Sequence, residues 1–109
     1  AALSIRSAEL FTYDAADTLD RAVSPDCLGY ERRAQIRAQA GHAAQLVLSA
    51  LHTLVNVHGA SSFAESSRLQ RIWRDANTAA RHAGLNAMVG YETYGKALLR
   101  LEERITAMV

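Results

Sequence analysis

Apolar residues recur every three or four positions along most of this chain, which is the spacing of one face of an α-helix. The first such stripe predicts a helix from Ala1 to about Ala22. Ser24 and Pro25 follow it, and this pair fits the start of a second helix, with the serine as N-cap and the proline in the first turn. The positions on the first stripe are Leu3, Ser7, Leu10, Phe11, Ala15, Leu19 and Ala22.

The second stripe predicts a helix from about Pro25 to His58, with Gly59 as its C-terminal stop. Such a helix is roughly 50 Å long at 1.5 Å per residue, unless Gly29 or Gly41 breaks it. A helix of this length needs packing partners along its whole length, from the same chain or from another subunit. The stripe consists of Ile36, Ala40, Ala43, Val47, Ala50, Leu51, Leu54 and Val57.

Two further helices follow a loop that spans residues 59–66. Ser67 and Gln70 have capping-box spacing, so a third helix is expected from there to about Gly84. Asn86 can cap a fourth helix that reaches roughly Arg104. Its stripe is Ala87, Tyr91, Tyr94, Leu98, Leu101 and Ile105. Four helices joined by short connections predict an all-α, up-and-down four-helix bundle formed by one domain, residues 1–109.

The composition agrees with a globular helical domain and limits the kinds of partner that it can bind. The chain has one proline, 50% hydrophobic residues, 21% charged residues and a net charge of +1. This excludes intrinsic disorder, and it gives no electrostatic footprint for nucleic acid or an anionic membrane. We also expect no membrane span, because no apolar run is long enough. The single cysteine, Cys27, cannot form an internal disulfide, which predicts a reducing, cytoplasmic location.

The third predicted helix carries a polar stripe beside its apolar one. Arg71, Asp75, Thr78 and His82 are spaced i, i+4, i+7 and i+11, and the first two could form an ion pair. Spacing alone favours a solvated surface with one salt bridge. The alternative is a buried or inter-subunit polar seam in which His82 points into a site, since histidine changes its charge near neutral pH.

A metal site and a cysteine nucleophile are not expected. The four histidines form no Glu-x-x-His pair, and one cysteine cannot build the usual structural zinc site. Cys27 lies in a first helical turn, where a thiol pKa can be lowered, but nothing in the sequence pairs with it. We therefore expect a small, semi-buried side chain there.

Residues 57–82, VHGASSFAESSRLQRIWRDANTAARH, resemble the C-terminal helical domain of the acyl-CoA dehydrogenase superfamily. Gly59, the small loop up to Phe63, and the Arg74-Asp75-Ala76 run match that family in order and spacing. The run from Ser66 to His82 is closer to the two-component flavin-dependent monooxygenases of the same fold, as is Tyr94-Gly95-Lys96-Ala97-Leu98-Leu99. Many of the dehydrogenases place a catalytic glutamate where His82, Ala83 and Gly84 stand here, so the carboxylate base of those enzymes is missing at this position.

The resemblance implies a C-terminal part of a longer chain that uses reduced FMN or FAD from a separate flavin reductase. The expected substrate is a small aromatic or polycyclic molecule, and the expected assembly is a homotetramer. By resemblance, His82 lies near the flavin and hydrogen-bonds an oxygen held there or on the substrate. Arg74, Asp75 and Thr78 form the seam that holds it, and Gly59, Ala60 and Ser61 lie near the flavin of a partner subunit.

Two other interpretations remain open at this stage. An acyl-CoA dehydrogenase, with its base supplied from elsewhere, is reduced by its own substrate. A non-catalytic helical interaction module assembles but binds no flavin.

Overall fold

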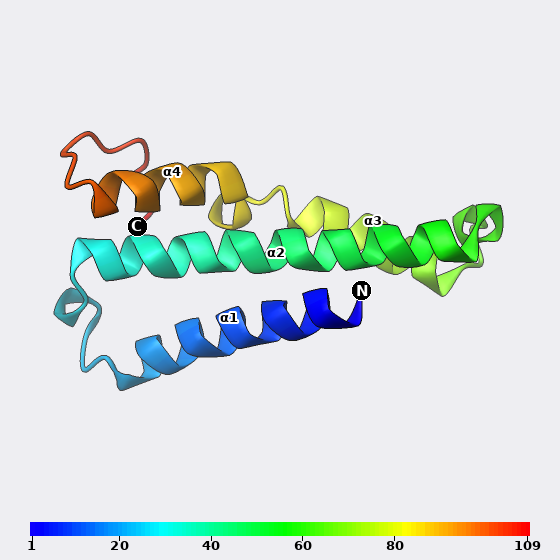
Figure 1. Ribbon diagram of the computed structural model, residues 1–109, viewed down its shortest axis with the longest axis horizontal. Coiled ribbons are helices and arrows are strands. Elements are labelled where there is room, and N and C mark those ends of the chain that lie inside the picture. Colours follow the sequence, from blue (N-terminus) through cyan, green and yellow to red (C-terminus); the bar gives the residue numbers. More distant parts are fainter.

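The computed structural model describes residues 1–109, except for the side chain of Pro25 (Figure 1). Its elements confirm the expected all-α domain. They are α1 (Ala2–Arg21), the 3₁₀ turn η1 (Pro25–Cys27), α2 (Tyr30–His58), the 3₁₀ turn η2 (Ala60–Phe63), α3 (Arg68–Ala79), the 3₁₀ turn η3 (Ala83–Leu85) and α4 (Ala87–Leu98).

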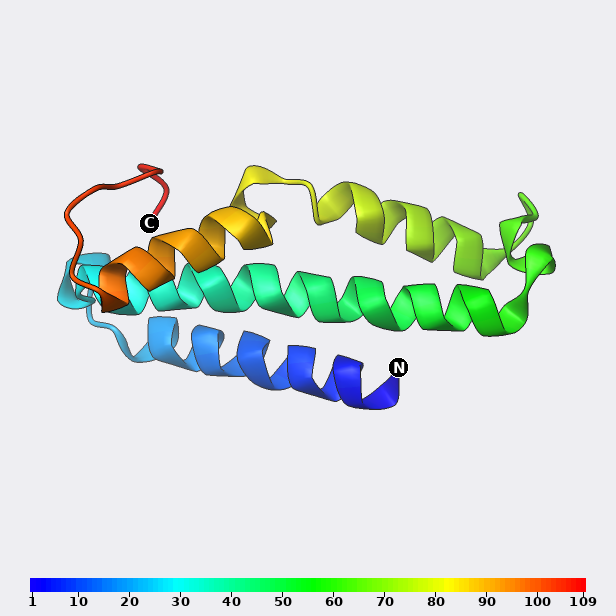
Figure 2. The same ribbon diagram turned by 45° about the horizontal axis from the view of Figure 1, so that its top comes forward.

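The long helix α2 is the axis of the molecule. Its 29 residues extend for about 44 Å, in a molecule of 48 × 28 × 20 Å. Helix α1 runs antiparallel along one side of α2, while α3 and α4 follow one another along another side (Figure 2). All the other helices are therefore arranged around α2.

The core is built mainly from alanine, so the helices approach one another closely. Only two larger aliphatic side chains, Leu51 and Val55, join the buried alanines in it. A Cβ added to Gly41 would lie 2.8 Å from the Cα of Ala87, so α2 and α4 touch backbone to backbone there. The buried alanines are Ala8, Ala15, Ala34, Ala38, Ala43, Ala50, Ala87 and Ala97.

The predicted caps of the third and fourth helices are present, whereas Ser24 does not cap the second helix, whose N-cap is Gly29. The Ser67 hydroxyl accepts the N–H of Gln70 at 3.3 Å, and the Asn86 side chain accepts from Met88 N at 3.1 Å and Val89 N at 3.3 Å. Gly59 has φ of 79° after α2, in the left-handed region that glycine enters without strain. Local sequence signals thus set these boundaries.

Two predicted helix boundaries were wrong near the middle of the chain. The second helix begins at Tyr30, after Gly29, and the preceding 3₁₀ turn is separate from it. The third helix ends at Ala79 instead of Gly84. The imidazole of His82 accepts the N–H of Gly84, and this local bond competes with further helical bonding.

The predicted extension of the fourth helix to Arg104 was also wrong. Helix α4 ends at Leu98 because Arg100 takes a left-handed conformation with φ of 55°. The N–H of Leu101 then bonds to Lys96 O and that of Arg100 to Ala97 O, both at 3.0 Å, which is a Schellman motif. The segment 99–109 turns back towards α2 as an irregular tail (Figure 1).

None of the described helices is both long enough and apolar enough to cross a bilayer.

Candidate functional site

The predicted site residues lie at both ends of α3 and along it. Gly59, Ala60 and Ser61 precede the helix, in and next to η2, while His82 follows it and begins η3. Helix α3 has 12 residues, so the two groups are separated by at least about 18 Å. A single copy of the chain therefore cannot place residues 59–61 and His82 against the same atom of a ligand.

His82 has a defined orientation although it is exposed. Its Nδ1 accepts the N–H of Gly84 at 3.1 Å, and its backbone carbonyl accepts the N–H of Leu85 at 2.9 Å. Because Nδ1 accepts, the proton of the neutral ring is on Nε2. The turn thus carries an N–H donor on an exposed side chain, whose ring is oriented by a bond to the backbone rather than to another side chain.

Arg74 and Thr78 come together in a groove between α2 and α3 of about 630 Å³. The Thr78 hydroxyl already donates to the carbonyl of Arg74 at 3.0 Å, so its remaining capacity is as an acceptor. The groove is lined by His52, Trp73, Arg74, Asn77, Thr78 and Arg81. It is therefore rich in donors and carries two guanidinium groups.

The groove continues towards α4 through residues that line both halves. His52, Asn77 and Arg81 also border a neighbouring hollow of about 710 Å³, which extends to Tyr91. Arg81 is held in place by a 2.6 Å bond from Nη1 to the carbonyl of Asn77. His82 directly follows Arg81 in the sequence, but it is not among the residues that line the two described halves of the groove.

An aromatic cluster that the sequence did not predict lies at the groove, which two of its members, Trp73 and His52, line. The ring centroid of Trp73 lies 5.9 Å from that of Phe63 and 6.0 Å from that of His52, both edge-on. Trp73 Nε1 is buried and has no hydrogen-bond partner among the described residues. Trp73, Asn77 and Arg81 are four residues apart, and this spacing was the sequence signal that could have revealed which face of α3 lines the groove.

The expected Arg71–Asp75 ion pair was wrong, since these two side chains are not paired with each other among the described residues and both are exposed. An i, i+4 pair with the cation on the N-terminal side is the weaker orientation, and water screens it at the surface. Asp75 also does not line the groove that holds Arg74 and Thr78. The polar stripe is thus a surface of this chain.

The loop before α3 is held by a buried serine, and its outer backbone is exposed to solvent. The buried Ser62 donates to the carbonyl of Val55 at 3.1 Å and also contacts the carbonyl of Gly59. Nothing lies within 4 Å of a Cβ built on Gly59, and Ala60 and Ser61 are exposed. A ligand or a neighbouring chain can therefore approach this backbone closely.

The structure also describes the possible metal ligands and the single cysteine. No group of three or more His, Cys, Asp or Glu side chains among them is placed to hold a metal ion. Cys27 is free and exposed, which corrects the expectation of a semi-buried side chain. Its hydroxyl neighbour Ser24 lies 3.3 Å from Sγ and lowers the pKa of the thiol.

Comparison with known proteins agrees with this architecture. Residues 1–87 match the family model described as acyl-CoA dehydrogenase, C-terminal domain. The solved structure of XiaF from Streptomyces sp. in complex with FADH2 and glycerol is similar, with a TM-score of 0.91 and 48% sequence identity. That match covers 99% of this chain and 27% of XiaF, so this chain spans about a quarter of XiaF's length. The comparison with curated proteins gives no match.

Proposed function

The chain belongs to the acyl-CoA dehydrogenase family, as its C-terminal domain, and from this premise we propose that it is part of a flavin-dependent monooxygenase. The longer protein uses reduced flavin and O₂ to hydroxylate an aromatic or polycyclic substrate, and a separate reductase supplies the flavin. The observation that carries the proposal is His82, which presents a fixed N–H donor where many dehydrogenases have a carboxylate base. XiaF, which is 48% identical, holds FADH2.

The donor set of the α2–α3 groove fits a flavin nucleotide. Flavins offer ring carbonyls and phosphate oxygens, which are acceptors, and the groove is lined by the guanidinium-bearing residues Arg74 and Arg81. When bound, reduced flavin supplies the electrons that activate O₂. Because XiaF holds FADH2, FAD is the better-supported flavin, with FMN as the alternative.

His82 then has one role, which is to donate from Nε2 to an oxygen atom next to the flavin. The bond from Gly84 N–H keeps the ring oriented for this without cost at the moment of reaction. Arg74, Asp75 and Thr78 form the polar surface that leads to it along α3. Gly59, Ala60 and Ser61, about 18 Å away, contact the flavin of a partner subunit through their open backbone.

Self-association is supported by how much surface the chain leaves uncovered. Its accessible area of 7408 Å² exceeds by about 1,500 Å² the area expected for a compact protein of 11.9 kDa. Its radius of gyration of 16.2 Å is likewise larger than the roughly 13 Å expected for this length. About 800 Å² per partner suffices for a stable interface, so the excess leaves room for contacts between subunits, as in a homotetramer, beside contacts with the rest of the longer chain.

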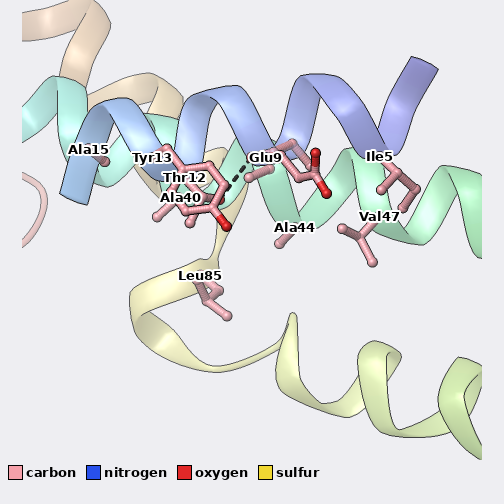
Figure 3. A pocket seen from close by; sticks show the side chains of 11 residues that line it. Ile5, Glu9, Thr12, Tyr13, Ala15, Ala40, Ala44, Val47 and Leu85 are labelled. Atoms are coloured by element: carbon pink, nitrogen blue, oxygen red, sulfur yellow. Dashed lines mark hydrogen bonds between the residues drawn. The ribbon is translucent and has the colours of Figure 1, made fainter. Parts of the chain in front are cut away.

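An apolar groove between α1 and α2 is the best candidate for this contact. It measures about 500 Å³ and is lined almost entirely by apolar atoms. Figure 3 shows Ile5 and Val47 towards one end of it, and Leu85 of η3, which also lines the groove, lies below the two helices in this view. Its alanine floor, which includes Ala40 and Ala44, lets another helix approach closely.

Anaerobic mixing of the full-length flavoprotein with octanoyl-CoA tests the proposed reaction. We expect the oxidised flavin to keep its visible absorbance, because the carboxylate base of many dehydrogenases is missing at positions 82–84. Added reduced flavin should instead consume O₂, with hydroxylation of probes such as phenol or 2-naphthol. Bleaching by octanoyl-CoA in the absence of a reductase would identify an acyl-CoA dehydrogenase. Assembly of the full-length protein without any flavin binding, measured by sedimentation, would identify a non-catalytic interaction module.

A further inference from the structure

Arg37, in the N-terminal half of α2, joins two segments that are distant in sequence. Its Nη2 donates to the carbonyl of Ala83 at 2.8 Å, and its Nη1 donates to the carbonyl of Met108 at 2.9 Å. Ala83 is the residue that follows His82, and Met108 belongs to the tail. One guanidinium group therefore ties both the η3 turn and the tail to the central helix.

The backbone that carries Arg37 lies at a close helix contact. A Cβ added to Gly90 of α4 would lie 3.3 Å from the carbonyl oxygen of Arg37 and 3.1 Å from the Cα of Ala38. Ala38 itself is buried. The backbone at such a contact has little freedom to move. The side chain that it carries can therefore hold another group in a defined position.

The guanidinium group of Arg37 donates hydrogen bonds to two separate carbonyl groups. It is partly enclosed, and its third group, Nε, is buried without a partner among the described residues. The two bonds to Ala83 and Met108 therefore set its orientation. A planar fork can hold two carbonyls in this way, whereas a lysine ammonium is a point charge on a flexible stem.

Two further contacts hold the tail that shares this arginine. Lys96 bonds to Glu103 at 3.2 Å, and the Arg104 guanidinium lies 4.2 Å from the centre of the Tyr30 ring. The tail is thus attached to α4 and to the start of α2 as well as to Arg37. Displacing it would change the surroundings of the guanidinium that holds the His82 turn.

We propose that Arg37 is a positioning residue for His82. It fixes the carbonyl of Ala83 while Gly84 fixes the imidazole, so three consecutive residues of the turn are held from different sides. The role of the turn in oxygen chemistry rests on the proposed function, but the physical link between Arg37 and the turn does not.

Two variants of the full-length protein test the link, Arg37→Lys and Arg37→Met. Arg32→Lys is the matched control, because Arg32 also lies on α2 and makes two side-chain hydrogen bonds, but to Gln35 and to Thr18 of α1. The first measurement is hydrogen exchange of the amides of Gly84 and Leu85, both of which bond to His82. The second is the rate of hydrogen peroxide release after the flavin-reduced protein is mixed with O₂.

We expect amide exchange at residues 84 and 85 to accelerate about tenfold in Arg37→Met and less in Arg37→Lys, with no change in Arg32→Lys. Peroxide release should rise in the same order. Unchanged exchange at the turn in both Arg37 variants would overturn the proposal, as would equal acceleration in Arg32→Lys. Faster exchange with unchanged peroxide release would keep the link but contradict the oxygen role of His82, which separates the two failures.

Discussion

Gly41 of α2 and Ala87 of α4 meet backbone to backbone, since a Cβ on the glycine would lie 2.8 Å from the alanine Cα. Real side chains essentially never come this close, and the obstacle is backbone that cannot move aside. Ala87 is the first residue of α4 and lies two residues after η3. This contact therefore sets the position of the chain just beyond the His82 turn.

Gly41→Ala should destabilise the protein by about 1–3 kcal/mol, because the added methyl group forces α2 and α4 apart. The change would otherwise favour the helix by up to about 1 kcal/mol. Gly95→Ala is the matched control, since Gly95 lies in α4 with nothing within 4 Å of an added Cβ, and it should be neutral or stabilising. Thermal unfolding of the three proteins checks this, and a stabilised Gly41→Ala variant would contradict the close contact.

Asn86→Ala should cost about 1 kcal/mol, because it removes the cap from two amides at the start of α4. Ser67→Ala removes a single, longer 3.3 Å bond at the start of α3 and should cost less. Denaturant unfolding of both variants compares them. A larger loss for Ser67→Ala would show that the two caps are not ranked by their hydrogen bonds.

The thiol of Cys27 should react faster than an ordinary cysteine at pH 8. Hydrogen bonds with Ser24 lower the pKa of this exposed thiol from its usual 9.0, so more thiolate is present in the folded protein. Ser24→Ala removes the hydroxyl, returns the pKa towards its usual value and should slow alkylation by iodoacetamide. The difference should vanish well above pH 9 and in urea; a difference that persists in urea would rule out a folded-state cause.

The groove between α1 and α2 should be sensitive to charge if it forms the contact between subunits. Ala44→Arg places a buried cation in this apolar groove and should reduce the assembly of the full-length protein to a smaller species. Ser49→Arg changes an exposed position of the same helix outside the groove and should have no effect. Analytical ultracentrifugation of both variants gives the answer, and an unchanged Ala44→Arg assembly would exclude this groove.

Helical periodicity and capping residues sufficed to predict the all-α fold and the starts of α3 and α4. They failed where local bonding competes with the period. The His82 imidazole ends the third helix early, and Arg100 ends the fourth despite the apolar spacing of Leu101 and Ile105. Helix propensity describes average preference, whereas these ends depend on specific bonds to backbone groups.

The candidate site was less predictable than the fold. The stripe of Arg71, Asp75, Thr78 and His82 was predicted on one helix, but α3 ends at Ala79 and His82 lies beyond it. Only Thr78 among these four lines the groove. The role of Arg37 could not be predicted, because its partners lie 46 and 71 residues away and no local pattern marks them. Long-range bonds from a side chain to the backbone leave no periodic signal in a sequence.

The most direct test of this account is the rate of peroxide release from the full-length, flavin-reduced protein when His82 is replaced. His82→Asn is the sharper variant, because an asparagine oxygen can still accept the Gly84 N–H and preserve the turn, while the Nε2 donor is lost. We predict that, on mixing with O₂, His82→Asn and His82→Ala release peroxide about tenfold faster than the unmodified protein. Rates equal to that of the unmodified protein in both variants, with unchanged product yield, would contradict the account.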